Sequence, residues 1–548
     1  MTILFSTSSL GFLRNFQSTV RLLATRGHTV HILAERTDTL DGQPLAETLA
    51  AEYPGRVTWA MLPSSPHRLW SALGVGVRSS LDYWRYLDPR WARSDKLRAR
   101  GASMAPASAR LLPSLIGTGA GLSVASRLFR TVDRALPPAR EVIDEFDRVN
   151  PDLVLLTPLL YFGSHQVDYA RCARQRGIPS AVGIGSWDHL TTKGLLHEIP
   201  DRVLVWNEAQ KGEAVALHGV APEQVTVTGA QAYDHWFAMA PSTDRDAFCG
   251  RVGLDPRRPF LLYLCSSPFI APDEVGHVRR WMTAIRASGD PRLRDVGLLV
   301  RPHPQNARQW RSVDLAAEFD NVAFYPKAGA NPIAGTARAD YFDSMHHAEA
   351  VVGVNTSGMI ESGIVGRPVF TIQTDEFAKT QDGTLHFQHL KNGGLLHLAG
   401  SLDEHVEQLT RVMADPVTAQ RRTREFVQSF VRPHGLDVPA TPRFVADLEA
   451  LAALPAPAPR PATVAGRGIR IVLAPLALAL MVLAVPAAKR RAIVLHWTRP
   501  ARLAGRRLVS RSIYAARFLR RLPLVGIRAV LRLLRLTRRA GLRLVGRL

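Results

Sequence analysis

The 548-residue sequence predicts an α/β protein in which two doubly wound, Rossmann-like domains face a cleft and a basic amphipathic helical tail follows. Two observations lead to this class. Short apolar segments alternate with longer helical patterns in two separate series, which is typical of parallel sheets covered by helices. In addition, residues 461–548 contain 20 Lys and Arg and no Asp or Glu, whereas residues 1–460 hold 49 basic and 47 acidic side chains. A nearly neutral body therefore carries a strongly cationic end.

The first series predicts an N-terminal Rossmann-like acceptor domain over residues 1–240. A strand, a helix at Phe16–Thr25 and a second strand open the chain as a βαβ unit. Residues 70–137 are rich in Arg, Ser and Pro and lack strand patterns, so we expect a helical insertion there. The strands of this domain are expected at Thr2–Ser9, His28–Glu35, Arg56–Leu62, Asp152–Thr157, Ser180–Gly185, Arg202–Trp206 and Gln224–Thr228.

The second series predicts a C-terminal Rossmann-like nucleotide-donor domain over residues 255–450. Loops at the carboxyl ends of two such sheets meet across a cleft, which is the expected ligand site. The strands of this domain are expected at Pro259–Ser267, Val296–Pro304, Asn321–Pro326, Ala350–Ser357 and Arg367–Ile372.

The tail begins with a Pro- and Ala-rich linker over residues 451–470, whose prolines lack the backbone donors that a helix needs. Residues 471–488 then form an uncharged segment of 18 residues, the lower limit for crossing a bilayer, and Pro475 and Pro486 weaken it further. A single span would place the 18 basic residues from Lys489 onward on the side opposite the body, against the positive-inside rule. A re-entrant or interfacial segment is therefore expected, with a single span as the alternative.

The end of the tail repeats arginine every three or four residues from Arg528 to Arg547, which predicts a basic stripe on a helix. Apolar residues among the charges favour an anionic membrane surface over nucleic acid as the partner of residues 471–548. The alternative is a basic face that packs on the protein's own body.

The N-terminus and the cysteines indicate a cytoplasmic body. The opening residues lack a basic region before their apolar run, and Arg14 interrupts that run, so no signal peptide is expected. The three cysteines are odd in number and include no CxxC pair, which argues against a disulfide framework and a zinc site.

The strongest candidate site follows a predicted buried strand at Gly353–Pro368. Asn355, Thr356 and Ser357 can cap a helix that starts near Gly358, and the free N–H groups of that helix end would bind phosphate. Glu361, one turn further, could accept hydrogen bonds from a ribose. The alternative is an ordinary capped helix with Glu361 in solvent.

Two other loops of the second domain carry candidate donor-binding residues. Arg301 and His303 leave a strand end, where an arginine can fork onto phosphate oxygens and a histidine can shuttle a proton. Ser266 and Ser267 follow the first strand of this domain and could form a phosphate nest. A structural role for the histidine is the alternative.

In the first domain, one loop supplies candidate chemistry. Asp188 and His189 could act as a general base, and Lys193 could contact an anion, unless this loop is only rich in turn formers. Arg14 and Asn15, in the loop after the first strand, are expected as acceptor-side or auxiliary contacts. The lone glycine of that loop falls short of a dinucleotide fingerprint, so NAD or FAD is not expected.

His386 and His389 are further acceptor-side or auxiliary candidates. Their spacing would also allow a metal site, but no third ligand is evident, and no aspartate pair resembles a DxD clamp. We therefore expect no metal and no cofactor.

The RGH segment at Arg26–His28 and the strand–NTSG–helix–Glu–GRPV element around Glu361 resemble GT-B glycosyltransferases, and are most similar to bacterial CDP-glycerol glycerophosphotransferases and capsule polysaccharide transferases. The SWDHLTTKG loop lies where those glycerophosphotransferases carry a base in a His-Gly-Thr-Pro string, which is absent here. His303-Pro304 matches their His-Pro, and Thr356-Ser357 is a looser counterpart of their phosphate loop.

The resemblance implies an in-line displacement with a nucleotide as leaving group, in bacterial cell-surface polysaccharide or teichoic-acid-like polymer synthesis. The donor would be a nucleotide-activated sugar or glycerol, and the acceptor a lipid-linked or polymer hydroxyl, deprotonated by Asp188 or, less favoured, His189. The protein would lie on the cytoplasmic face of the inner membrane, attached through its tail. The alternatives are a sugar-nucleotide 2-epimerase and a non-catalytic lipid-binding scaffold of a polymer assembly machine.

Overall fold

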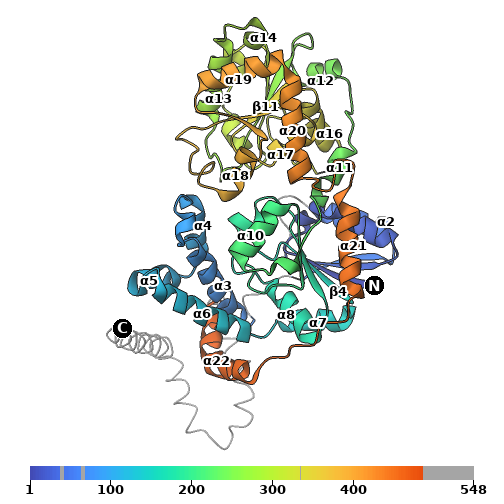
Figure 1. The fold of residues 1–548 in the computed structure, drawn as a ribbon, viewed down its shortest axis with the longest axis vertical. Helices are drawn as coiled ribbons and strands as arrows, with labels where there is room; N and C mark the ends of the chain where they lie inside the picture. Colours follow the sequence, from blue (N-terminus) through green and yellow to red (C-terminus); the bar gives the residue numbers. More distant parts are fainter. Residues whose placement is uncertain (37–41, 63–67, 334, 485–548) are drawn as a thin grey trace, which may run out of the picture.

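The computed structural model describes residues 1–36, 42–62, 68–333 and 335–484, and contains two parallel sheets, each in its own domain (Figure 1). The first sheet has seven strands in the order β3-β2-β1-β4-β5-β6-β7, and the second has six in the order β10-β9-β8-β11-β12-β13. Helices separate successive strands in both domains. The predicted fold class, two Rossmann-like domains in a GT-B-like arrangement, is confirmed.

The first sheet is built around β1, whose residues from Ile3 onward are buried because it lies between β2 and β4. Phe5 pairs with Ile32 of β2 on one side and with Leu155 of β4 on the other. The strand order reverses here, so the loops after β1 and β4 leave in opposite directions and open a crevice. The strands are β1 (Thr2–Thr7), β2 (Thr29–Ala34), β3 (Val57–Met61), β4 (Leu153–Thr157), β5 (Ser180–Gly183), β6 (Arg202–Val205) and β7 (Val225–Val227).

The helices of the first domain include the insertion that the sequence predicts. Its four α-helices, α3 (Ser71–Arg85), α4 (Asp95–Met104), α5 (Ala107–Ile116) and α6 (Ala120–Ala135), lie at one side of the molecule (Figure 1). The helices that connect the strands are η1 (Leu10–Asn15), α1 (Gln17–Thr25), α2 (Gln43–Glu52), α7 (Arg140–Val149), α8 (Val167–Arg176), α9 (His189–Thr192) and α10 (Glu208–His218).

The second sheet repeats the same plan, with its reversal between β8 and β11. Its edge strand β13 was not expected from the sequence, because it has only four residues, two of them half-buried. The strands are β8 (Phe260–Leu264), β9 (Gly297–Arg301), β10 (Val322–Phe324), β11 (Ala350–Gly353), β12 (Val369–Ile372) and β13 (Leu396–Ala399), and the longer helices are α12 (Arg245–Val252), α13 (Val275–Arg286), α16 (Gly335–His346), α18 (Leu385–Asn392), α19 (Leu402–Ala414) and α20 (Pro416–Phe430).

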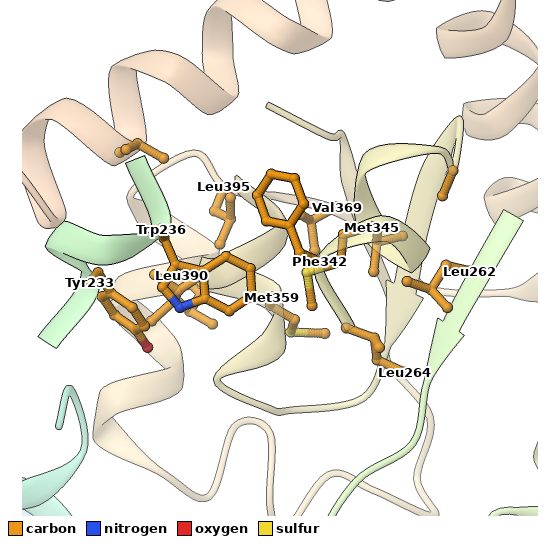
Figure 2. Close-up of a cluster of buried hydrophobic side chains, with 14 of the residues drawn as sticks. Tyr233, Trp236, Leu262, Leu264, Phe342, Met345, Met359, Val369, Leu390 and Leu395 are labelled. Carbon is orange, nitrogen blue, oxygen red and sulfur yellow. The ribbon is translucent and has the colours of Figure 1, made fainter. Parts of the chain in front are cut away.

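The segment that joins the domains takes part in the core of the second one. Tyr233 and Trp236, from the short helices η4 (Gln231–Tyr233) and α11 (Asp234–Phe237), belong to the same buried cluster as Phe342 and Met359 (Figure 2). Burial of large aromatic side chains is a strong stabilising contribution. The connection between the domains is thus a packed element.

The chain crosses back to the first domain before it ends. Helix α21 (Ala440–Ala453) places Phe444 and Leu448 in the core of the first domain, with the Phe444 and Phe16 ring centroids 5.9 Å apart. The second domain therefore ends before α21, earlier than the expected boundary at residue 450.

Helix α22 (Val464–Ala484) follows, so helical structure begins inside the expected linker. It is long and apolar enough to cross a membrane by length and composition, with a mean hydropathy of 1.9, and 11% of that window is buried. It packs on α3 and α6 through Leu473, Ala477 and Leu480. Residues 485–488 of the apolar segment and the arginine stripe from Arg528 lie outside the described residues.

Candidate active site between the two sheets

Arg14 lies in η1, directly after β1, and is exposed. Within the described residues, no carboxylate forms an ion pair with it. The pKa of His189 and of His303 is lowered to about 4, mainly by burial, and the Arg14 charge contributes to both shifts. This charge therefore acts on both domains. An uncompensated guanidinium between two domains is suited to an anionic ligand. The sequence indicated Arg14 only as an auxiliary contact.

Asn15 lies beside Gly185 in the loop after β5. A Cβ added at Gly185 would lie 3.1 Å from the Phe16 ring and 3.4 Å from the Asn15 Nδ2, so this glycine allows the two loops to approach each other. The loop after β1 is thereby held against the loop that carries Asp188.

Both oxygens of the Asp188 carboxylate accept hydrogen bonds at the start of α9. One oxygen accepts a hydrogen bond from Ser186 Oγ at 2.5 Å and the other from Thr192 Oγ1 at 2.8 Å. Burial alone would raise the pKa of Asp188, but the charges of Lys193 and the neighbouring histidines and the Ser186 hydrogen bond lower it overall. The carboxylate is therefore ionised and holds its loop. Its role as catalytic base stays a prediction.

His189 is the neighbouring candidate base and is only 3% exposed. The ring centroids of His189 and Phe12 are 5.7 Å apart in an edge-to-face arrangement. The Nδ1 of His189 is buried without a hydrogen-bond partner. Burial lowers its pKa to about 4, against an opposing effect of Asp188, so the imidazole is neutral at pH 7 and can accept a proton. Lys193 follows in the same loop, and burial lowers its pKa while the Asp188 charge opposes this.

Arg301 and Glu361 lie on either side of Tyr341 in the second domain. The Arg301 guanidinium is 4.9 Å from the centre of the Tyr341 ring, and the Tyr341 hydroxyl donates to Glu361 Oε2 at 2.8 Å. Arg301 Nη1 donates to the carbonyl of Asp340 at 3.3 Å, whereas its Nη2 is buried without a partner. Burial lowers the pKa of Arg301 to about 10, so it remains a cation at neutral pH. Tyr341 lies within α16, where no local pattern marks it as functional.

Glu361 lies on α17 (Gly358–Ile364) and is half-buried. Burial raises its pKa, while the Tyr341 hydrogen bond and the Arg14 charge lower it. Tyr233 lies within the electrostatic reach of Glu361, Arg14 and Asp188, and burial raises its pKa well above its usual value. The two domains therefore bring Arg14, Asp188, Tyr233 and Glu361 into one electrostatic environment.

The loop before α17 differs from the expected cap. Asn355 is buried, and its Nδ2 donates to the carbonyl of Thr380 at 2.6 Å, so it fixes the loop to a distant segment. Thr356 Oγ1 accepts a hydrogen bond from the N–H of Gly358 at 3.4 Å. Ser357 occupies the N-cap position without a side-chain cap. Phosphate binding by these residues stays a prediction.

The loop after β8 is held by a carboxylate that the sequence did not indicate. Glu274 is fully buried, and its Oε2 accepts from the N–H of Ser266 at 2.8 Å. Burial raises its pKa to about 8. Ser266 Oγ is buried, Ser267 is half-buried in the same loop, and His303 Nδ1 accepts from the N–H of Gln305 at 3.2 Å. These loops lie at the carboxyl ends of β8 and β9.

His386 and His389 on α18 reach across to the first domain. His386 Nδ1 is 3.3 Å from Thr191 Oγ1, and His389 Nε2 is 2.6 Å from Glu213 Oε1 on α10. Because the two rings contact different partners, they hold the domains together. Among the described residues, no three His, Cys, Asp or Glu side chains are grouped to hold a metal ion. Metal independence stays a prediction.

Glu361→Ala is expected to weaken nucleotide binding by about ten- to a hundredfold, because one charged hydrogen-bond acceptor is lost. Isothermal titration with UDP and CDP measures the change, and thermal unfolding checks that the domain is intact. Glu407→Ala, at an exposed position of α19, is the matched control. Equal nucleotide affinity in wild type and Glu361→Ala would show that Glu361 does not contact the ribose.

Comparison with known proteins gives matches among solved structures. No family model matches the sequence, and no curated protein matches it. Among solved structures, UDP-GlcNAc 2-epimerase from Methanocaldococcus jannaschii is 11% identical, with a TM-score of 0.48, covering 82% of this chain and 100% of that one. The Neisseria meningitidis UDP-GlcNAc 2-epimerase bound to UDP-GlcNAc is 12% identical, with a TM-score of 0.44 and coverages of 82% and 100%.

Anabaena Alr3699/HepE in complex with UDP and glucose is a third such structure, 11% identical, with a TM-score of 0.46 and coverages of 82% and 100%. At this level of identity and TM-score, the likeness concerns the fold and carries no argument about ligand or reaction. The chemistry of the cleft has to be argued from its own residues.

Proposed function

We propose that the chain is an enzyme that binds a nucleotide-diphosphate-activated sugar between its two domains and transfers the sugar to an acceptor hydroxyl. The observation that supports this proposal is Arg14, a cation that forms no ion pair among the described residues and whose charge lowers the pKa of His303 and of Glu361 in the opposite domain. A diphosphate supplies the missing negative charge.

The roles of the other residues follow from their positions. Arg301 offers a buried, unpartnered Nη2 as a second cationic contact for the diphosphate. Glu361, oriented by Tyr341, would accept hydrogen bonds from the ribose. A cation fixed where the leaving phosphate gains charge stabilises the transition state more than the ground state.

The reaction would be an in-line displacement. The acceptor oxygen attacks the anomeric carbon, the bond from that carbon to the phosphate oxygen breaks, and the nucleotide leaves with the electron pair. The acceptor proton passes to His189, which is neutral at pH 7, while Asp188 holds the loop and stabilises the cationic ring. Asp188 as the base itself is the alternative within this mechanism.

A 2-epimerase of nucleotide sugars is the second candidate. The contacts of His386 with Thr191 and of His389 with Glu213 join the two domains, so a ligand bound between them would be enclosed on that side. An enclosed site suits a reaction that needs no acceptor. In that reaction the sugar's configuration at C2 changes and the nucleotide is retained in the product.

Location and partners complete the proposal. The cationic end of the chain would hold the protein on the cytoplasmic face of a bacterial inner membrane, where a lipid-linked or polymer acceptor is accessible. The donor could also be nucleotide-activated glycerol, and a scaffold without activity remains the non-enzymatic alternative.

One assay distinguishes these functions. The full-length protein is incubated with a panel of UDP-, GDP- and dTDP-sugars and CDP-glycerol, with and without membrane lipid extract, and nucleotide release and proton NMR spectra are recorded. Transfer is expected to release nucleotide only when acceptor lipid is present. A changed C2 signal without net nucleotide release would establish epimerisation instead. If no sugar changes and no nucleotide binds, the protein is the scaffold without activity.

A further inference from the structure

The insertion helices and α22 carry most of the exposed apolar side chains of the described residues. Of the large apolar side chains that are exposed, all but Val417 and Leu454 lie on α4, α5, α6 or α22. On α5, Leu111 and Leu115 are 64% and 70% exposed, and on α6, Val124 and Leu128 are 63% and 54% exposed. Each pair is four residues apart and therefore lies on one face of its helix. Because α5 and α6 pack together, the two pairs lie on neighbouring helices, and exposed apolar side chains that cluster in this way mark an interaction site.

Helix α22 extends this surface. It is attached to the insertion by apolar contacts and by Arg470, whose Nε donates to the carbonyl of Ala135 at 2.5 Å. On its outer side, Ile471 and Val472 are each 76% exposed. Helix α22 lies at the end of the molecule away from the second domain, α5 lies at the side of the first domain, and α6 lies between them (Figure 1). We call the exposed side chains of these three helices the apolar end surface.

The charges around the apolar end surface have one sign. Residues 96–140 contain eight Lys and Arg and one acidic residue, Asp133. Asp133 is buried and paired with Arg78 at 3.1 Å and Arg171 at 3.2 Å, so it contributes no negative charge at the surface. The exposed arginines on α5, α6 and α22 include Arg110, Arg127, Arg134 and Arg467.

Apolar side chains rimmed by arginines complement a bilayer that has an apolar interior and anionic headgroups. The remaining 64 residues, 485–548, carry 18 basic and no acidic side chains, so like charges oppose their packing on the same rim. We propose that the apolar end surface docks on an anionic lipid bilayer, in addition to any attachment through residues 485–548. This proposal does not rest on the reaction proposed above.

The docked surface would be connected to the cleft through α3. Arg85 donates to the carbonyls of Leu190 at 3.0 Å and Gly194 at 2.9 Å, and the Tyr86 hydroxyl donates to the carbonyl of Lys193 at 2.7 Å. These carbonyls belong to the loop that carries Asp188 and His189. Because α3 also packs against α6 and α22, two helices of the docked surface and this loop contact the same helix.

The test is flotation of the full-length protein with vesicles of phosphatidylcholine and phosphatidylglycerol, or of phosphatidylcholine alone, at low salt and at about 0.5 M salt. The higher salt shortens the Debye length to a few ångströms and suppresses purely electrostatic attachment. The variant Leu111→Gln/Leu115→Gln/Val124→Gln/Leu128→Gln is expected to bind anionic vesicles at least about tenfold more weakly than wild type at high salt, because apolar burial is lost. Val417→Gln, at a 70% exposed position of α20, is the matched control and should bind as wild type.

A second measurement changes only one residue of the surface at a time. The three native cysteines are all buried, so Leu115→Cys and Val417→Cys can each be labelled with a polarity-sensitive fluorophore. Emission from position 115 is expected to shift to the blue on anionic vesicles, and emission from position 417 to stay unchanged.

Several results would overturn the proposal. These are wild-type affinity of the quadruple variant at high salt, no spectral shift at position 115, and equal binding to vesicles without phosphatidylglycerol. A wild-type dimer that the quadruple variant converts to a monomer would show that a second copy covers the surface instead.

Discussion

His189→Gln is expected to lower turnover by about 10²- to 10⁴-fold, the contribution typical of a positioned general base, while the affinity for the nucleotide sugar stays near wild type. The expectation rests on a neutral imidazole whose Nδ1 is buried without a partner in the described residues, next to Arg14 and Asp188. Glutamine keeps polar contacts and cannot take up the proton. Single-turnover kinetics and titration with donor measure the two quantities separately.

Asp188→Asn provides the comparison for that result. Because both carboxylate oxygens accept hydrogen bonds from hydroxyls, an amide nitrogen would face one of these donors, and the melting temperature should fall. The folded pKa is lowered, so the stabilisation from Asp188 is present above about pH 4, the unfolded value, and is lost as the pH falls toward the folded pKa. A loss of turnover larger than that of His189→Gln, with an unchanged melting temperature, would identify Asp188 as the base.

Arg14→Ala is expected to lower kcat/KM by about 10²- to 10³-fold, because the cation that faces the leaving diphosphate is removed. Donor binding should weaken as well, since the ground-state diphosphate carries the same charge. Arg14→Lys should recover part of the loss, because lysine keeps the charge but lacks the planar fork.

The matched control for Arg14 is Arg424→Ala, an exposed arginine on α20 outside the cleft. It should leave kcat/KM and nucleotide affinity unchanged. If Arg14→Ala behaves like this control in a protein that turns over nucleotide sugars, the diphosphate lies elsewhere and the proposed site is wrong.

The parallel sheets could be predicted because their strands are apolar runs bounded by glycine, proline or charged residues. The segment Val296–Pro304, for example, contains β9 at Gly297–Arg301. Strand β13 escaped the prediction because four residues at a sheet edge do not form a distinct apolar run. The boundary at residue 450 differed for another reason: α21 has an ordinary amphipathic pattern, which does not reveal the domain whose core it joins.

The candidate site was predictable only as a set of loops. Their positions after β1, β5, β8, β9 and β11 follow from the fold, because parallel strands end on one side of a sheet. The partners of the side chains depend on tertiary contacts. Asn355 bonds to Thr380 instead of capping α17, and Glu361 is oriented by Tyr341, 20 residues earlier in the chain. No local spacing encodes such pairs.

The return of α21 has a consequence for synthesis of the protein on the ribosome. Phe444, Val445, Leu448 and Leu451 complete the core around β1 and α1, which precede the whole second domain in the chain. That apolar surface stays exposed to solvent until the whole second domain and α21 have been translated. Domains commonly fold in order from the N-terminus, but the first domain here cannot complete its core in that order. A nascent chain stalled before residue 440 should therefore expose the Phe16 side of the first domain and bind chaperones there.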